Sequence, residues 1–434
     1  MSSPDGLLKA AAERLAHRTP LLDPDDLAAF VRPFFGRADT FLAAARAHGS
    51  PLYILEEHVL RERAQRFLSA FRAELPRLRA YYAVKSNNLP AVARILAEAG
   101  LGLDVSSGLE LAAALPCPTD DIVFSGPAKL DPELALAVEH RDRVTVLMDS
   151  FAELERLERV AGAAGHVVRA GVRLTTDERG LWRKFGISLA DLPRFFDAAA
   201  RCPHVDLRGL QFHMSWNLGP ASQVAFIRRL GNALGALDAA HRGRVEFIDV
   251  GGGYWPPQGE WLHATATPEG QVAQAISPVH KPPLRHHRCP AVPIETFARE
   301  IAQAVKQHIF PHVQCNICAE PGRWLSSDAL HILLTVVERK ADDIAITDGG
   351  TNAIGWERFE TDYFPVLNLS RPSPAERECY VLGSLCTPHD VWGYAYHGTD
   401  IQPGDVLLIP TQGAYTTSLR QHFIKPLPSV LVLP

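Results

Sequence analysis

The sequence predicts an α/β barrel, a (β/α)₈ barrel, followed by a mostly antiparallel all-β domain. Eight short apolar runs alternate with amphipathic segments between Arg79 and Glu320, and polar or charged side chains follow most of these runs. After Glu320 the long helical patterns stop, and turn signals separate further short apolar runs. Strands that alternate with helices over short links form a parallel sheet, and eight such units close into a barrel.

The predicted barrel strands have the apolar and β-branched composition that is typical of buried strands. They are Arg79–Val84, Leu101–Asp104, Asp121–Ser125, Val144–Met148, Val167–Leu174, Leu207–His213, Val245–Val250 and Gln314–Glu320. The segments between them follow the apolar period of a helix. The predicted helices include Ala91–Ala99, Phe151–Gly162, Leu189–Ala200, Ala225–Ala240 and Ile294–Gln307.

The second domain is predicted from strand-like runs that follow Leu325. They are His331–Val337, Ile344–Thr347, Glu378–Val381, Val406–Ile409 and Val430–Leu433. Turn signals such as Asp348-Gly-Gly350 separate them, and the short run Pro51–Leu55 is expected to join the same domain. Helical patterns at Leu7–Leu15, Pro24–Phe30 and Thr40–Ala47 are interpreted as an accessory N-terminal extension.

These patterns give the expected domain boundaries. We expect a helical extension over residues 1–45, a strand of the β domain within 46–58, the barrel over 59–325 and the β domain over 326–434. Residues 254–293 form a long insert in the barrel that contains Trp, Pro and His. A loop longer than about 15 residues in a compact domain is usually functional or disordered. We interpret the insert as a lid or specificity element over the active site.

Composition narrows the class of protein. The 434 residues are 47% apolar and carry a formal net charge of −5, which fits two domains with a sizeable core. No basic run is long enough to indicate nucleic acid or an anionic membrane as a partner. The sequence also shows no secretory leader pattern and no stretch of eighteen apolar residues. We therefore expect a soluble, cytoplasmic protein.

The seven cysteines are scattered and predict no metal site. Cys315 and Cys318 have CxxC spacing, but side chains three apart in a strand face opposite sides of it. Without a second pair of ligands, a buried structural pair is favoured over zinc. His286-His287 stands near Cys289 in a Pro-rich stretch and is interpreted as exposed to solvent.

The segment Tyr82-Ala-Val-Lys85-Ser-Asn87 places a lone lysine at the end of an apolar strand. Partial desolvation there favours the neutral amine, which is a nucleophile for an aldehyde. An isolated lysine at a strand end is more often one that reaches into solvent. The ends of the other predicted strands decide between these interpretations, because a barrel concentrates its chemistry there. They carry Asp104, Ser125, Asp149, Arg173, His213, Gly251 to Gly253 and Glu320.

Six motifs then occur in a recognisable order. They are Tyr82-Ala-Val-Lys-Ser-Asn87, Lys184-Phe-Gly186, Asp249-Val-Gly-Gly-Gly253, Glu320-Pro-Gly-Arg323, Gly383-Ser-Leu-Cys386 and Gly413-Ala-Tyr415. Together they resemble the pyridoxal-phosphate-dependent ornithine/diaminopimelate/arginine decarboxylase family (fold type III). The resemblance runs from about Pro51 to the C-terminus. It implies the alanine-racemase-like fold, a barrel plus a β domain.

The resemblance implies pyridoxal 5′-phosphate as the cofactor. Lys85 would hold it as an imine, and the glycine turn would bring backbone N–H groups to its phosphate. Such a glycine run taken alone indicates only a tight turn. The cofactor-binding residues that the resemblance implies are Lys85, His213, Ser215, Gly251, Gly252, Gly253, Glu320, Gly322, Arg323 and Tyr415. Asp104 and Glu110 stand where the family has support residues, and Asp249 is interpreted as a strand-end support.

Glu320 favours decarboxylation as the reaction. A carboxylate beside the pyridine nitrogen stabilises its protonated form and strengthens the ring as an electron sink, whereas alanine racemases of this fold have an arginine there. By resemblance, Lys85, His213 and Cys386 are the catalytic residues, acting through the Lys85 imine and a quinonoid to give an amine and CO₂. His213 would stack on the ring, and Cys386 would protonate the carbanion. Taken alone, either residue is also compatible with an ordinary buried side chain.

Departures from the family pattern bear on the substrate. An acid usually follows the active-site cysteine and binds the distal ammonium, but Thr387 stands there; Asp390 follows. Trp216 occupies a position where a phosphate-binding serine is expected, and Ser215 is the replacement candidate. Thr387, Asp390 and Trp216 are therefore the predicted substrate residues. Candidate substrates are a D-amino acid, a basic amino acid bound by Asp390, or an amino-acid conjugate.

Two other functions remain open at this point. One is a racemase of the same fold, against which Glu320 argues. The other is a non-catalytic regulatory homologue, which has no chemical reason to retain Lys85, Arg323, Cys386 and Tyr415. A homodimer is expected, because in the family the loop with the cysteine completes the partner's site.

Overall fold

The computed structural model describes residues 3–16, 18–277, 283–355 and 361–434, so residues 278–282 of the predicted insert lie outside the described residues. The chain forms two compact units. Unit 1 consists of Met1–Glu56, Gln258–Ala291 and Asp328–Pro434, and unit 2 of Glu57–Pro257 and Val292–Ser327. Within the described ranges no helix combines the length and the apolarity that crossing a bilayer requires.

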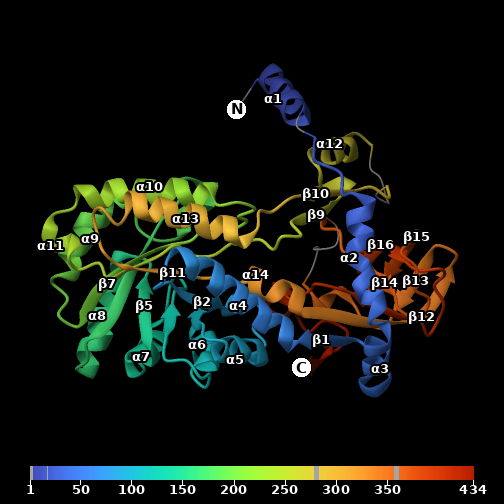
Figure 1. The fold of residues 1–434 in the computed structure, drawn as a ribbon, viewed down its shortest axis with the longest axis horizontal. Coiled ribbons are helices and arrows are strands. Elements are labelled where there is room, and N and C mark those ends of the chain that lie inside the picture. Colours follow the sequence, from blue (N-terminus) through green and yellow to red (C-terminus); the bar gives the residue numbers. More distant parts are fainter. Residues whose placement is uncertain (1–2, 17, 278–282, 356–360) are drawn as a thin grey trace. The chain divides into compact units, whose positions relative to one another are not determined.

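Unit 2 contains a closed barrel of eight parallel strands (Figure 1). They are β2 (Arg79–Ala83), β3 (Gly102–Val105), β4 (Ile122–Phe124), β5 (Val144–Met148), β6 (Val168–Leu174), β7 (Val205–Phe212), β8 (Phe247–Asp249) and β11 (Asn316–Ala319). β11 closes the barrel because it pairs with both β2 and β8. Each strand coincides with one of the eight predicted from the sequence, and the predicted fold class is confirmed.

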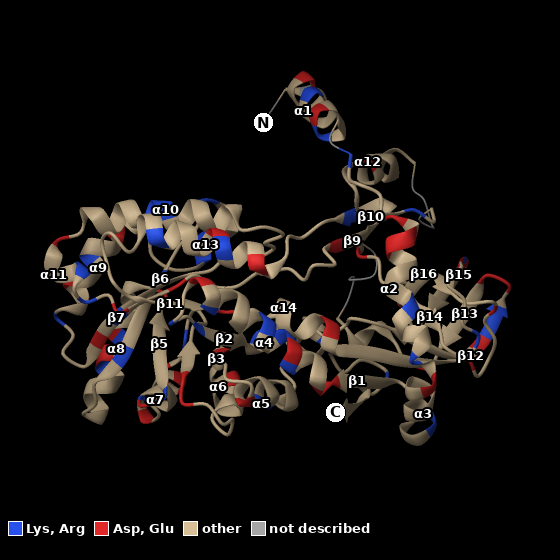
Figure 2. Cartoon of the chain, in the orientation of Figure 1, with Lys and Arg blue, Asp and Glu red and all other residues tan. Residues whose placement is uncertain are grey.

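Helices surround these strands. They are α4 (Glu57–Glu74), α5 (Pro90–Glu98), α6 (Gly108–Ala114), α7 (Asp131–Glu139), α8 (Phe151–Ala164), α9 (Leu192–Ala199), α10 (Ala221–Ala236), α11 (Ala239–Arg242), α13 (Ile294–His308) and α14 (Arg323–Ser326). In α4 the side chains of Leu60, Phe67 and Phe71 are buried, while acidic and basic residues occupy other positions of the helix (Figure 2). This division is the apolar stripe of a helix that packs on a sheet.

Local signals in the sequence explain where several helices begin and end. The Oγ of Ser150 accepts a hydrogen bond from Glu153 N at 3.1 Å and caps the start of α8. The same helix ends at Gly165, which has φ +68°, a conformation that glycine adopts without a Cβ penalty. Pro90 opens α5 at a position where its missing N–H leaves no helical hydrogen bond unmade.

The interior of the barrel is filled by side chains from several strands. Tyr81, Val123, Leu147, Phe247 and Cys318 form one buried cluster contributed by β2, β4, β5, β8 and β11. Filling of this kind is expected for an eight-stranded barrel, whose interior is just wide enough for side chains. The barrel is therefore a packed core with its chemistry confined to its ends.

Unit 1 contains an eight-stranded mixed sheet. Its strands are β1 (Leu52–Glu56), β12 (Leu330–Ala341), β13 (Ile344–Thr347), β14 (Leu367–Asn368), β15 (Glu376–Leu382), β16 (Val391–His397), β17 (Val406–Ile409) and β18 (Ser429–Leu433). Five pairings are antiparallel and three parallel. The sequence predicted this separate β domain, but it missed β14 and β16.

The second and third of the N-terminal helices contribute to the core of unit 1. They are α1 (Pro4–Ala16), α2 (Pro24–Gly36) and α3 (Ala38–His48). Val31 of α2 and Phe41 of α3 are fully buried in one cluster with Leu52 and Leu333 of the sheet. The interpretation of residues 1–45 as an accessory extension is therefore wrong for α2 and α3, because their apolar faces complete the core of the β domain.

The insert 254–293 carries regular structure, and most of it belongs to unit 1. Gln258–Ala291 contains β9 (Glu260–His263), α12 (Pro268–Ile276) and β10 (His286–Cys289) and groups with the β domain, whereas the sequence placed the whole insert in the barrel. Its role as a lid stays a prediction. The remaining short elements are η1 (Val84–Ser86), η2 (Gly180–Lys184), η3 (Leu189–Asp191), η4 (Ala264–Ala266), η5 (Ser327–Ala329), η6 (Thr351–Ala353) and α16 (Thr416–Leu419).

The two adjacent histidines of the insert are not exposed. His286 and His287 are each 9% exposed. His286 stacks on the ring of Tyr363 at 3.4 Å between centroids, and its Nε2 lies 2.9 Å from an Oε2 of Glu376. The prediction of solvent exposure was wrong because these partners come from distant parts of the sequence.

Candidate active site

Lys85 lies just beyond the end of β2, in the short helix η1. Its Nζ donates a hydrogen bond to Oδ2 of Asp104 at 2.8 Å. Asp104 is fully buried near the end of β3, and its other oxygen accepts a hydrogen bond from Oγ of Ser125. The Lys85 side chain is 32% exposed. A buried carboxylate therefore positions the amine while the side chain remains accessible.

Three buried carboxyl groups at this end of the barrel differ in their tendency to ionise. Burial, reinforced by the charge of Glu320, raises the pKa of Asp104. Burial and the same neighbour raise the pKa of Asp249 well above its usual range. Burial would also raise the pKa of Glu320, but hydrogen bonding to His213 and the charge of Lys85 outweigh it, so the pKa of Glu320 is lowered. Glu320 is the one of the three whose pKa its surroundings lower, which favours its charged form.

His213 follows β7 and contacts two groups through one nitrogen. Its Nδ1 lies 3.2 Å from Oε2 of Glu320, and Gly252 N donates to the same Nδ1 at 3.2 Å. One nitrogen cannot donate to the first and accept from the second at once. Burial lowers the pKa of His213 and favours the neutral ring. In the neutral tautomer protonated at Nδ1, His213 donates to Glu320 and lowers the pKa of that carboxyl; in the other tautomer, Nδ1 accepts from Gly252 N.

The glycine turn after β8 is held by side chains of the barrel. Gly251 N donates to Oδ1 of Asp249 at 2.8 Å, so Asp249 supports the turn. Gly251 and Gly253 have φ of +68° and +81°, and a Cβ on Gly252 would lie 2.2 Å from the carbonyl oxygen of Glu320. The N–H groups of Gly251 and Gly252 are therefore used within the protein. Among the described residues, the Gly253 N–H has no such acceptor.

The segment after β7 packs on this turn through Asn217. The Asn217 Nδ2 donates to Gly252 O at 3.0 Å and to Met214 O at 3.2 Å, and its backbone N donates to Gly253 O at 2.9 Å. Ser215 is half-buried, and no hydrogen bond of its hydroxyl is found in the described part of the chain. Trp216 is 64% exposed and has φ +60°. Ser215 and Trp216 thus lie beside the glycine turn.

Arg323 begins α14 and lies on aromatic rings. Its guanidinium carbon is 4.2 Å from the ring centroid of Trp255 and 5.9 Å from that of Trp216. Stacking uses the flat face of a guanidinium, while its N–H donors lie in the plane. Gly322, the preceding residue, packs closely on Ser86, since a Cβ there would meet the Ser86 Cβ at 2.9 Å. This contact holds the Glu320-Pro-Gly-Arg turn against η1.

Other polar residues of the rim support loops. Ser106 N donates to Glu110 Oε2 at 2.7 Å, which fixes the segment after β3. Gly186 N donates to Asp149 Oδ1 at 3.0 Å, which ties the Lys184-Phe-Gly186 motif to the end of β5. Burial raises the pKa of both Glu110 and Asp149.

The remaining predicted residues lie in unit 1 and are described within that unit. Cys386 is exposed, and Thr387 Oγ1 accepts a hydrogen bond from His389 N at 3.4 Å. Tyr415 precedes α16 with φ +63°. Asp390 is buried and does not fit its predicted role as a substrate residue. Its carboxylate accepts three hydrogen bonds from unit 1, which gives it a loop-supporting function.

Sequence reasoning missed two polar residues of the barrel end. Gln211 is buried in β7, and its Nε2 donates to Glu320 Oε1 at 3.2 Å. Asn217 connects the two loops described above. The signal for Gln211 was its place in β7 on the face opposite Asp206 and Arg208, the charged residues of the strand, because alternation directs such a position inward. Asn217 gave no comparable signal, because its partners are backbone carbonyls.

These residues fit pyridoxal phosphate. Lys85 supplies an accessible amine for an aldehyde, and Glu320 supplies a carboxylate whose surroundings favour its charged form. The Gly253 N–H, the Ser215 hydroxyl and the Arg323 guanidinium are donors of the type that binds phosphate. The close approach of Gly252 to Glu320 requires a residue without a Cβ at that position.

Comparison with known proteins agrees with this fit. A family profile described as "Pyridoxal-dependent decarboxylase, pyridoxal binding domain" matches residues 60–327. The chain is 29% identical to the diaminopimelate decarboxylase of Methanothermobacter thermautotrophicus, over 89% of this chain and 87% of the relative. It is 26% identical to the L-glutamyl-[BtrI acyl-carrier protein] decarboxylase of Niallia circulans, over 80% of this chain and 81% of the relative.

The fold agrees with solved structures as well. The diaminopimelate decarboxylase of M. jannaschii, in complex with L-lysine, superimposes with a TM-score of 0.74 at 23% identity, covering 90% of this chain and 88% of that one. The family match spans more than half of the sequence and includes every barrel strand. The chain belongs to the pyridoxal-dependent decarboxylase family and is a pyridoxal-phosphate-dependent amino-acid decarboxylase.

Proposed function

We propose that this decarboxylase acts on an amino-acid conjugate, a substrate whose α-amino and α-carboxyl groups are free and whose far end is covalently joined to another group. The observation that carries the proposal is the state of the loop Gly383–Asp390, whose only acidic residue is Asp390. Its Oδ1 accepts from Thr351 N at 2.7 Å and from Thr351 Oγ1 at 3.0 Å, and its Oδ2 accepts from Leu385 N at 2.6 Å.

Recognition of a distal ammonium requires a carboxylate, because a neutral hydroxyl forms no ion pair with it. Thr387 stands where the family pattern has that carboxylate, and Asp390 is committed to its own loop. A basic amino acid bound by Asp390 is therefore disfavoured. A D-amino acid remains a second candidate only if its far end carries no ammonium.

One relative supports this substrate class. The Niallia circulans protein is named for an L-glutamyl group on an acyl-carrier protein, a conjugate without a distal ammonium on the amino acid. We extend that chemistry to the present chain as a proposal: a thioester or amide of an acidic amino acid, decarboxylated at its free α-carboxyl group.

The residues of the barrel end divide the work of the reaction. Bound pyridoxal phosphate supplies an electron sink for the electrons left at the α-carbon when CO₂ departs. Asp104 orients the Lys85 amine, and Lys85 would bind the cofactor through its aldehyde. Glu320 would stabilise a proton on the ring nitrogen, which would favour decarboxylation over racemisation. His213, as a neutral imidazole, would contact the ring. Gly253, Ser215 and Arg323 would bind the phosphate, and Gly251, Gly252 and Gly322 shape the turns of the barrel end that carry these donors.

Proton return to the α-carbon requires a donor, and we assign it to the thiol of Cys386. Its exposure supports this role. The proposal includes a homodimer in which this loop of one copy completes the site of the other, so that Cys386 and Thr387 contact substrate bound to the partner's barrel. Mixing inactive Lys85→Ala protein with inactive Cys386→Ala protein would then restore activity, because one of the two sites in a mixed dimer contains both residues.

The substrate class is tested by CO₂ release from a panel. The purified holoenzyme is given L-ornithine, L-lysine, meso-diaminopimelate, free L-glutamate and a pantetheine thioester of L-glutamate. The thioester is formed with the side-chain carboxyl, so the α-carboxyl group stays free. We expect the thioester to give the largest kcat/KM. A larger kcat/KM for ornithine, lysine or diaminopimelate would contradict the proposal. Loss of optical activity without CO₂ would instead establish a racemase.

A matched pair of variants tests the role of the loop. Thr387→Glu introduces the missing carboxylate, and Thr387→Val keeps the size without a charge. We expect Thr387→Glu to raise turnover of diaminopimelate relative to the thioester, because it supplies an ion-pair partner for the distal ammonium. Thr387→Val is expected to leave that ratio unchanged. Equal ratios in both variants would show that residue 387 does not contact the far end of the substrate.

A further inference from the structure

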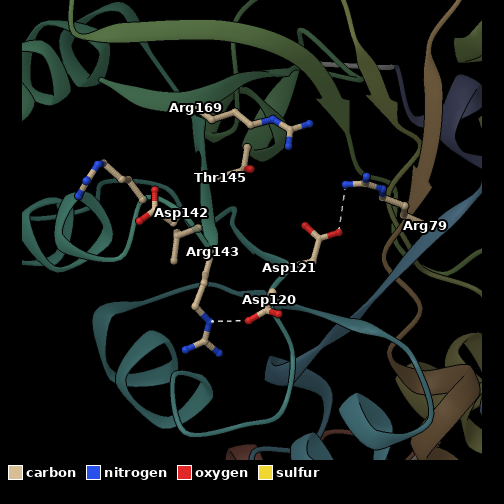
Figure 3. Close-up of a pocket in the computed structure, with 9 residues that line it drawn as sticks. Arg79, Asp120, Asp121, Asp142, Arg143, Thr145 and Arg169 are labelled. Carbon is tan, nitrogen blue, oxygen red and sulfur yellow. Dashed lines mark hydrogen bonds and ion pairs between the residues drawn. The ribbon is translucent and has the colours of Figure 1, made fainter. Parts of the chain in front are cut away.

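A cavity opens at the end of the barrel opposite Lys85. Its volume is about 280 Å³, and it is lined by residues at the amino-terminal ends of β2, β5 and β6 and by the segments before β4 and β5 (Figure 3). Four arginines and three aspartates line it, a net charge of +1. Lys85, Asp104 and Glu320 lie at the other ends of their strands, so this cavity is separate from the catalytic residues.

Arg169 is the central cation of the cavity. Its guanidinium lies over the ring of Phe247, with 5.5 Å between the guanidinium carbon and the ring centroid. Its Nε is buried and has no hydrogen-bond partner. In the described ranges, no carboxylate forms an ion pair with Arg169. A guanidinium that is partly desolvated and unneutralised gains more from an anion than an exposed one does.

A hydroxyl and a second guanidinium face the same space. Thr145 lines the cavity, is only 7% exposed and makes no side-chain hydrogen bond to the part of the chain that the structure describes. Arg79 reaches the cavity from β2 and donates through Nη1 to Asp121 at 3.3 Å. Tyr81 OH also donates to Asp121, at 3.0 Å, so that carboxylate is shared. In Figure 3 the guanidinium groups of Arg169 and Arg79 project toward one another, and Thr145 lies below the Arg169 side chain.

The cavity is also lined by the half-buried Arg141, by Arg143 and by the exposed Asp120 and Asp142. Arg143 donates to the carbonyl oxygens of Leu115, Cys117 and Thr119. Asp142 lies at the exposed edge. In the part of the chain that the structure describes, Arg169 Nε and the Thr145 hydroxyl have no hydrogen-bond partner, and Arg79, which is paired with Asp121, lines the same cavity.

We infer that this cavity binds a small molecule through an oxyanion, a phosphate or a carboxylate, held by Arg169, Arg79 and Thr145. The planar donors of a guanidinium match the geometry of both anions, and an anion between two converging cations removes their mutual repulsion. The volume lies just below the range of about 300–1,000 Å³ found for ligand pockets, which fits a metabolite of few atoms. This oxyanion site would be a second binding site of the chain, whatever the substrate of the decarboxylation is.

The test uses holoenzyme, in which the cofactor already occupies its own phosphate-binding residues. Sodium phosphate and sodium succinate are titrated separately by calorimetry, at constant ionic strength maintained with sodium chloride. We expect saturable binding of at least one of them with one site per chain, and the stronger of the two identifies the anion class. Absence of saturable binding for both would overturn the inference.

Variants locate the site. Arg169→Gln is expected to weaken the binding about tenfold or more, since a charge-assisted hydrogen bond contributes more than the free energy of a tenfold change. Thr145→Val, which keeps the shape of the side chain, is expected to weaken it less. Arg228→Gln, at an exposed position of α10, is the matched control and should not change it. Equal affinities in the Arg169 and Arg228 variants would place the anion elsewhere and contradict the inference. Thr145→Val serves the same comparison if Arg169→Gln does not fold.

Discussion

The buried ion pair between Lys129 and Glu153 gives a sharp prediction about the stability of the barrel. Each side chain is only 1% exposed, and Lys129 Nζ lies 2.6 Å from Glu153 Oε1. The same Nζ also donates to Gly126 O and Leu147 O, each at 2.7 Å. Substitution Lys129→Met keeps most of the volume but removes all three hydrogen bonds. It leaves a buried carboxylate and two carbonyl groups without their donor.

The magnitude follows from this arrangement. Breaking a buried pair by removing one partner costs about 3–5 kcal/mol, because the other charge stays buried. Burial already raises the pKa of Glu153, so part of the cost is relieved when Glu153 takes up a proton. For a domain of this size, 1 kcal/mol corresponds to roughly 2–4 °C in Tm, so the barrel should lose roughly 6–20 °C.

The assay is thermal and urea unfolding of the holoenzyme followed by circular dichroism. Lys306→Met is the matched control, because Lys306 pairs with Glu74 at the surface, with 51% and 36% of the two side chains exposed. That change should cost less than about 1 kcal/mol. The double variant Lys129→Met/Glu153→Leu should recover most of the lost stability, since it removes both charges. Equal Tm values for the Lys129 and Lys306 variants would show that loss of the buried pair costs no more than loss of the surface pair.

Three further predictions concern other parts of the fold. Gly252→Ala forces a Cβ to 2.2 Å from the carbonyl oxygen of Glu320. The variant should therefore bind the cofactor more weakly in a titration and lose more than about 1 kcal/mol of stability. The control Gly36→Ala, whose Cβ meets no atom, should change neither cofactor binding nor stability. Asp390→Asn should destabilise the loop that carries Cys386 by about 1–3 kcal/mol, because both carboxylate oxygens accept hydrogen bonds and the amide NH2 group cannot replace one of them as an acceptor. Unfolding and limited proteolysis measure this, and unchanged proteolysis would contradict it. Glu56→Gln should flatten the acid side of the pH–stability curve measured in urea.

The sign of the last effect follows from the pKa of Glu56. Burial alone would raise it, but hydrogen bonds to His331 and Arg37 outweigh burial and lower it from 4.5 to about 2. A group with a lowered folded-state pKa contributes stability that is present above its unfolded-state pKa and lost as the pH falls through the folded value. The contribution of Glu56 is therefore complete above about pH 4.5 and disappears toward pH 2. A Glu56→Gln variant that loses as much stability as the wild type over this interval would disprove it.

The barrel could be predicted because its signals are local. Each strand is a short buried run followed by a helix with an apolar face, and parallel strands bring their ends together without further information. Lys85, Asp104, His213 and Glu320 could be placed on one rim for the same reason. The identity of the cofactor was predicted from the six motifs, because the apolar patterns alone do not indicate it.

What could not be predicted depends on contacts between distant residues. β16 (Val391–His397) lacks a clear alternation and contains Gly393, so neither strand signal was present. The burial of Lys129 depends on Glu153, 24 residues away, and that of Asp390 on Thr351, 39 residues away. A charged residue is predicted to be exposed when its partner is not known. The insert was misassigned for the same reason, because Trp261 joins the core of unit 1.

We propose that decarboxylation of an amino acid depends on Lys85 and bound pyridoxal phosphate. The most direct test measures CO₂ from the thioester and amino-acid panel with wild-type protein, Lys85→Ala and the control Lys306→Ala, each reconstituted with the cofactor. We expect CO₂ from one substrate with the wild type and the control, and none with Lys85→Ala, which should also lack the absorbance of covalently held cofactor. CO₂ release at the wild-type rate by Lys85→Ala would contradict it.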